Sequence, residues 1–146
     1  MNSKLQLGLV TFLLFFVSAT ASADQVRQAT LTNFAGDVMV RQDGGEWKPA
    51  TNGIVMKIND EIKTSSGASA EVLLDNGEVQ IREKTHFKID TMDLNPATGE
   101  KTTYLNLALG RILIHAQKLQ GDSKFEVRTP TSTTGVRGTV FEVSVD

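Results

Sequence analysis

The sequence predicts an all-β domain of short antiparallel strands in two sheets, built either as stacked strand–turn units or as a small β-sandwich. Apolar and polar residues alternate with a period of two through most of the chain after residue 24. No segment in that region carries a sustained apolar stripe with a period of 3.6 residues, so little helix is expected. Clusters of turn-forming residues separate the alternating segments, at positions 43–45, 52–53, 65–67 and 95–99.

The strongest local prediction is a hairpin near the middle of the chain. In residues 70–74 the even positions are apolar, and after the turn Val79 and Ile81 alternate with polar residues. Between the two segments, Asn76 and Gly77 are residues that tolerate the positive φ of a tight hairpin turn. This pattern indicates an antiparallel pair of strands with one face buried.

The other expected strands show the same alternation on either side of this hairpin. Before it, Val38 and Val40 follow Gly36. After it, the apolar positions are Phe87 and Ile89; Leu105, Leu107 and Leu109; Ile112 and Ile114 after a break at Gly110; Phe125 and Val127; and Phe141, Val143 and Val145. A Gly-x-aliphatic unit recurs at Gly36, Gly77 and Gly110 with uneven spacing, which suggests similar stacked units rather than a strict repeat.

The first 23 residues have the order of a secretory signal peptide, which would leave a mature domain of residues 24–146. Lys4 precedes an apolar run at residues 7–17, and Ala21-Ser22-Ala23 supplies the small residues of a cleavage site. The apolar run is shorter than the roughly 20 residues that a membrane-spanning helix needs, so an uncleaved anchor is disfavoured. We therefore expect a periplasmic or secreted protein with no stable membrane span after cleavage.

Composition and residue spacing exclude several functional classes. The chain has 15 Lys and Arg against 17 Asp and Glu, without a basic stripe, so nucleic acid is not an expected partner. It has no cysteine, which excludes thiol chemistry and thiolate metal sites. Neither His86 nor His115 has a second ligand at a metal-like spacing, and no nucleophile–base pair is visible. We expect no cofactor and no enzymatic activity.

Seven short segments follow one another in an order that matches a known family. They are residues 36–38, 47–49, 59–64, 70–77, 109–112, 125–130 and 136–143. The series resembles the FecR domain family, named for the periplasmic part of the ferric citrate sensor, over roughly residues 35–146. Its most specific part is the closing motif, which consists of Thr129 and Pro130, then Val136, Arg137, Gly138 and Thr139, then Phe141.

The resemblance implies a solenoid-like domain of short stacked strands that lies outside the inner membrane and relays a signal by contact with other proteins. Signalling members carry a cytoplasmic anti-sigma segment and a transmembrane helix before this domain. This chain begins instead with the signal-like segment, so it resembles the exported, stand-alone versions. Family members usually continue with a further strand, so the last strand here is expected to be an open edge.

Within the closing motif, Arg137 is the obvious candidate for a binding residue. Glycines on both sides, Gly135 and Gly138, let the backbone turn tightly. The guanidinium then either presents its planar donors to a carboxylate or folds back onto buried carbonyls or a nearby acid. The second interpretation is favoured, since turns flanked by glycine are commonly structural.

The last predicted strand, residues 139–145, suggests how a partner is recruited. Its alternation turns Phe141, Val143 and Val145 inward. An open edge presents unpaired N–H and C=O groups that accept an added strand, giving a homodimer or a complex with an extended peptide. The alternative is that an earlier loop or the stretch at residues 25–31 covers this edge.

The remaining candidate is Trp47, which either stacks on a sugar ring or caps one end of the core. A glycan-binding module should expose several aromatic residues on one face, whereas Trp47 and Tyr104 are the only Trp and Tyr in the chain. The sequence therefore predicts an exported, non-enzymatic module that binds a protein of the cell envelope. A module that binds glycan or cell wall is the alternative.

Overall fold

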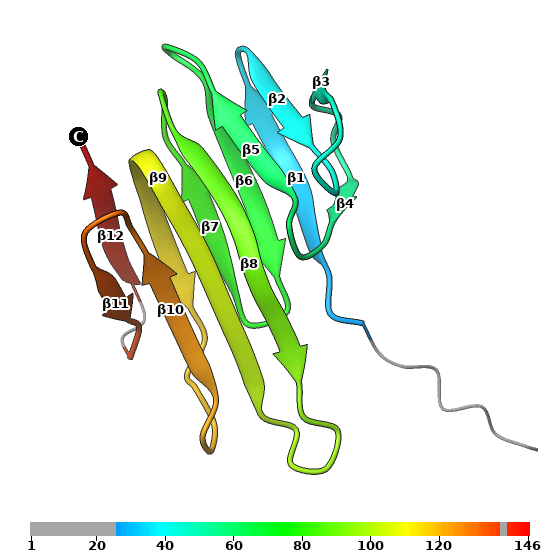
Figure 1. Ribbon diagram of the computed structural model, residues 1–146, viewed down its shortest axis with the longest axis vertical. Helices are drawn as coiled ribbons and strands as arrows, with labels where there is room; N and C mark the ends of the chain where they lie inside the picture. The colour runs from blue at the N-terminus through cyan, green and yellow to red at the C-terminus, as the bar shows by residue number, and fades with distance from the viewer. Residues whose placement is uncertain (1–25, 138–139) are drawn as a thin grey trace, which may run out of the picture.

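The computed structural model describes residues 26–137 and 140–146, and these form twelve strands joined by turns and loops (Figure 1). The strands are β1 (Ala29–Ala35), β2 (Val38–Arg41), β3 (Trp47–Pro49), β4 (Ile54–Met56), β5 (Glu61–Thr64), β6 (Ser69–Leu74), β7 (Gly77–Ile81), β8 (His86–Leu94), β9 (Lys101–Ala116), β10 (Lys124–Arg128), β11 (Thr133–Gly135) and β12 (Val140–Val145). The all-β prediction is confirmed. Within the described ranges the chain has no helix of the length and apolarity needed to cross a membrane.

The strands form one continuous sheet that curls over so that its two halves face each other (Figure 1). Layer 1 has the strand order β4-β1-β6-β7-β9-β12, and layer 2 has the order β3-β2-β5-β8-β9-β10-β11. The long strand β9 belongs to both layers. Its residues 101–109 pair with β8, and its residues 110–116 pair with β7 and β12.

The turn of β9 from one layer to the other takes place at Gly110. This residue has φ +97°, and a Cβ atom built on it would lie 2.2 Å from Thr85 Oγ1. The sequence predicted a break at Gly110, and the strand instead continues through a sharp bend. Because the two halves of β9 run in opposite directions, the chain that leaves β9 re-enters layer 2 at the end where β9 began.

This course of the chain explains the one strand pair that departs from the predicted antiparallel arrangement. Strand β10 pairs in parallel with β9, from Lys124 opposite Thr102 to Arg128 opposite Asn106. Period-two alternation gives no information on strand direction, so the parallel pair had no signal in the sequence.

The predicted hairpin is present as β6 and β7, but its turn differs from the prediction. Leu74 pairs with Gly77, so the two-residue loop is Asp75-Asn76. Neither Asn76 nor Gly77 has a positive φ, so the reason proposed for the glycine was wrong. A Cβ atom on Gly77 would lie 2.8 Å from the backbone oxygen of His115 in β9. The glycine therefore allows β9 to approach β7 closely.

The space between the layers is filled by the apolar positions that alternate along the strands. Fully buried members include Leu31, Met56, Val72, Ile81, Ile112 and Ile114 from layer 1 and Ile62, Phe87, Ile89, Leu105, Leu107 and Phe125 from layer 2. Strand β1 was not predicted. It lies between β4 and β6, away from β12, so the idea that residues 25–31 cover the last strand is wrong for the described part of that stretch.

Candidate functional site

The first candidate site is the edge formed by β12. This strand pairs antiparallel with β9, from Val140 opposite His115 to Val145 opposite Gly110. Among the described residues β12 has no second neighbour. Phe141, Val143 and Val145 are half-buried against the core, as their alternation predicted. The result is an edge strand whose apolar side continues the core up to the surface.

The closing motif connects the edge of layer 2 to this strand of layer 1. Thr129 closes the turn between β10 and β11, where its N–H donates to Ser132 O at 2.8 Å, and Pro130 is exposed beside it. Val136 is buried, and its N–H donates to Phe125 O at 2.8 Å. With Phe141 packed on the core, these residues hold the crossover between the two layers at the β11–β12 side.

Arg137, for which the sequence favoured a structural role, is exposed. No hydrogen bond or ion pair joins it to another described residue, so folding back onto buried carbonyls is not observed. It lines a surface hollow together with Lys118 and Lys124. Gly138 and Thr139, the next residues of the motif, lie outside the described residues.

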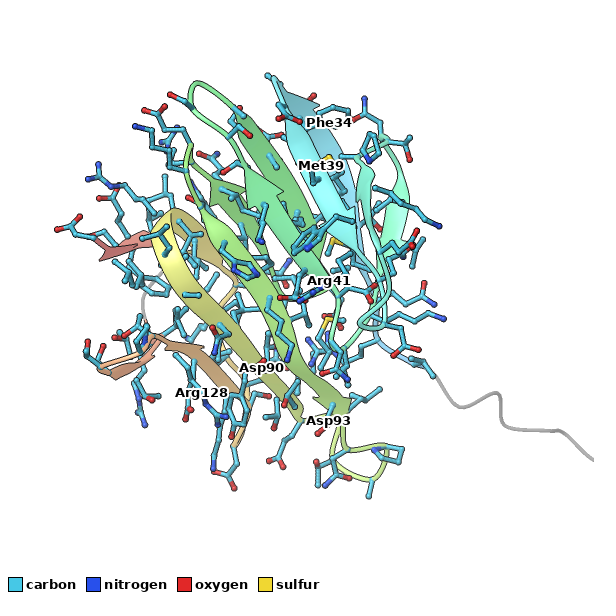
Figure 2. The ribbon with its side chains drawn as sticks, turned by 45° about the horizontal axis from the view of Figure 1, so that its top comes forward. Phe34, Met39, Arg41, Asp90, Asp93 and Arg128 are labelled. Carbon is cyan, nitrogen blue, oxygen red and sulfur yellow. The ribbon has the colours of Figure 1, made fainter. Side chains whose placement is uncertain are left out.

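The second candidate site is the outer face of layer 2, where Trp47 lies. Trp47 pairs with Arg41, whose neighbour Val40 points into the core, so the indole is on the outside and does not cap the core. The Arg41 guanidinium is 4.8 Å and the Lys63 ammonium is 4.3 Å from the ring centroid. The His86 ring meets the indole edge-on, with the centroids 5.8 Å apart. Figure 2 shows Arg41 on this face together with Asp90 and Arg128.

Glu61 connects two members of this cluster, Arg41 and His86, through its carboxylate. The Glu61 residue is 7% exposed, and its two oxygens bind Arg41 Nε at 2.6 Å and His86 Nε2 at 2.8 Å. Burial acts to raise the pKa of Glu61, but the hydrogen bonds from Arg41 and His86 outweigh burial and hold the pKa below its ordinary value. Both carboxylate oxygens are therefore engaged, which suits a fixed structural anion better than a general acid or base.

Acidification is expected to destabilise the domain through Glu61. The folded-state pKa lies below the ordinary 4.5, so the contribution of the carboxylate is complete above that pH and is lost as pH falls through the folded pKa. We expect the difference in melting temperature between the native chain and Glu61→Gln to be largest near about pH 6 and to shrink below about pH 4. A difference that stays constant over that range would contradict this assignment.

The second aromatic residue, Tyr104, lies on the same outer face. It pairs with Glu126 of β10 and carries the Arg128 guanidinium 4.1 Å above its ring. Arg128 is also 3.8 Å from the Glu126 carboxylate. In the sequence, Trp47 and Tyr104 are far apart and show no relation to each other. The fold places both on one face, each with a cation beside its ring.

The described residues of the chain contain no group of three His, Asp or Glu arranged to hold a metal ion. A model of the FecR protein family matches residues 60–146. The chain belongs to the FecR family. No curated protein and no solved structure matches it. FecR proteins form an envelope-associated family of signalling and regulatory proteins rather than of enzymes.

The FecR match covers β5 to β12 and contains the whole closing motif. Strands β1 to β4 precede the matched range, and with them Arg41 and Trp47. The β12 edge therefore belongs to the part that is typical of FecR proteins. The Trp47 cluster combines residues from both parts.

Proposed function

We propose that this FecR protein is an exported, non-enzymatic binding module that acts in the cell envelope through contact with another protein, with β12 as the contact strand. The observation that carries the proposal is that, within residues 26–137 and 140–146, β12 pairs with β9 alone. Export rests on the signal-like segment at residues 1–23, which would place the domain in the periplasm or outside the cell.

The physical basis is strand addition to an open sheet edge. Every second residue of an edge strand offers its N–H and C=O groups away from the sheet, and a partner strand satisfies them with a regular ladder. Phe141, Val143 and Val145 lie half-buried along this edge, so a partner strand with apolar residues at alternate positions would extend the core. The main chain supplies affinity, and these side chains supply selectivity.

A second copy of the chain satisfies these requirements in one register. An antiparallel pair of β12 strands centred on Val143 places Phe141 opposite Val145 and Glu142 opposite Ser144. A pair centred on Glu142 would instead place two carboxylates opposite each other, which is unfavourable. The homodimer is thus the form of strand addition that can be tested without knowing another partner.

Val143→Lys is expected to abolish strand addition, because an inward-pointing charge on an edge strand blocks pairing with another strand. The matched control is Val140→Lys, which places the same charge on the outer face of β12, where Val140 is 54% exposed. Sedimentation equilibrium should show that the native chain and Val140→Lys self-associate and that Val143→Lys is monomeric.

Cross-linking in the exported fraction should show that the native chain and Val140→Lys capture the same envelope proteins and that Val143→Lys does not. Thermal unfolding must show that Val143→Lys remains folded. The proposal is wrong if the native chain is monomeric and captures no protein, or if both lysine variants keep the contacts of the native chain.

A further inference from the structure

The outer face of layer 2 carries aromatic and cationic side chains that are needed neither for the core nor for strand addition at β12. Side chains there do not contribute to the core, yet the only tryptophan and the only tyrosine of the chain both lie on it. Each ring has at least one cation near it, at 4.3 and 4.8 Å from the Trp47 centroid and at 4.1 Å from the Tyr104 centroid. Keeping two large aromatic residues on an outer face, each paired with a cation, is typical of a recognition surface.

The charges at Trp47 are not balanced within the cluster. Glu61 is already engaged by Arg41 and His86. Lys63 lies over the indole, and no carboxylate of the described residues lies within ion-pair distance of it. Its ammonium therefore has donors free for an anion, held next to an apolar ring surface.

The second aromatic pair extends this surface along the strands. His86, beside Trp47, pairs with Leu109 of β9, whereas Tyr104 pairs with Thr91. Thr91 lies five residue steps after His86, which corresponds to about 16 Å along β8. Between them lie Lys88 and Asp90, whose charged groups are 3.5 Å apart. The surface is thus an elongated strip with an aromatic–cation pair at each end and hydrogen-bonding groups between.

We infer that this strip binds an acidic polysaccharide that carries carboxylate groups. The exposed parts of Trp47 and Tyr104 support the apolar faces of sugar rings, and the ammonium of Lys63 and the guanidinium of Arg128 take the carboxylates. The polar groups on β8 bind sugar hydroxyls. A protein partner would favour an apolar centre, whereas the charged pair of Lys88 and Asp90 lies in the middle of this strip. Nucleic acid would require a continuous row of cations for its evenly spaced phosphates, and Asp90 and Glu126 interrupt the cations here.

The test uses polygalacturonate and its methyl-esterified form, which has the same rings with the charge removed. Trp47 is the only tryptophan, so its fluorescence reports binding at this strip directly. We expect polygalacturonate to change the emission of the mature chain, with an affinity that falls as salt is added. The esterified polymer should bind at least about tenfold more weakly, equivalent to about 1.4 kcal/mol.

Two substitutions and one control separate this site from general charge effects. Lys63→Gln and Arg128→Gln should each weaken binding of polygalacturonate several-fold. Arg111→Gln removes the same charge from the outer face of layer 1, where Arg111 pairs with Glu142, and should leave the affinity unchanged. Trp47→Ala should not bind polygalacturonate, and this binding is measured by calorimetry because the variant lacks the only tryptophan.

The inference is overturned if the native chain does not bind polygalacturonate, if the esterified polymer binds equally well, or if Arg111→Gln weakens binding as much as Lys63→Gln. If Trp47→Ala fails to fold, the two glutamine variants decide the result. Val143→Lys should bind polygalacturonate like the native chain. The polysaccharide site and the proposed protein contact at β12 are therefore tested independently.

Discussion

Replacing Gly110 with alanine is expected to destabilise the domain by about 3–4 kcal/mol, from a positive φ that alanine adopts poorly together with forced overpacking. The added Cβ would lie 2.2 Å from Thr85 Oγ1 and 2.5 Å from Thr85 Cα. Thr85 cannot easily withdraw, because its N–H donates to Thr64 Oγ1 and its own Oγ1 accepts from the Arg111 N–H, each at 3.0 Å. The substitution therefore acts where β9 passes from one layer to the other.

Gly53→Ala is the matched control for this prediction. Gly53 also has a positive φ, +82°, but a Cβ atom there would meet nothing within 4 Å. Its substitution carries only the backbone term, about 1–2 kcal/mol. Equilibrium unfolding in urea should separate the two variants clearly. An equal loss of stability in both would mean that the contact with Thr85 has no energetic consequence.

The sequence predicted most strands because one face of nearly every strand is buried. The short strands β3, β4 and β5 were not predicted, because their three or four residues show no clear alternation. The longer β1 was not predicted either, and its pairing with β6 shifts in register between Leu31 and Asn33. This irregularity breaks the period of two, so Ala29 and Leu31 did not stand out although both are fully buried. Alternation also reports burial without direction, which is why the parallel pairing of β10 was not predicted.

The candidate site was predictable only in part, because its contacts join residues that are distant in sequence. The inward and outward residues of β12 followed from local alternation. The surroundings of Trp47 could not be predicted in this way, because its neighbours Lys63 and His86 belong to strands β5 and β8, which come later in the sequence. Glu61 gave no signal at all, because an acidic residue in a strand looks solvated until its partners are known.

The same reason explains why the buried arginine of the fold was not predicted. Arg137 attracted attention through its flanking glycines, yet it is exposed. The buried arginine is Arg27, which donates through one terminal nitrogen to the backbone carbonyls Asp93 O at 2.9 Å and Thr102 O at 3.0 Å. These partners are 66 and 75 residues away along the chain. No local pattern marks such a residue.

Arg27→Ala is expected to cost about 2–4 kcal/mol, because it removes a buried guanidinium that binds a half-buried carboxylate, the Thr103 hydroxyl and two backbone carbonyls. The Arg27 side chain is only 3% exposed and also binds Asp75, with 2.6 Å between the guanidinium nitrogen and the carboxylate oxygen. Burial acts to raise the pKa of Asp75, but hydrogen bonds from Arg27 and Lys101 outweigh it and hold the pKa below its ordinary value. The pair therefore anchors the segment before β1 to the turn between β6 and β7, where Asp75 lies.

Three comparisons identify the source of this loss. Arg111→Ala breaks an exposed pair with Glu142, at side-chain exposures of 54% and 48%, and should cost less than about 1 kcal/mol. Arg27→Lys keeps the charge but loses the fork that reaches a carboxylate and two carbonyls together, so its stability should fall between Arg27→Ala and the native chain. Asp75→Asn combined with Arg27→Ala should cost less than the sum of the single changes, because both remove one interaction. Additive losses in urea unfolding would show that Arg27 acts through the carbonyls alone, and a loss equal to that of Arg111→Ala would show that it does not anchor the fold.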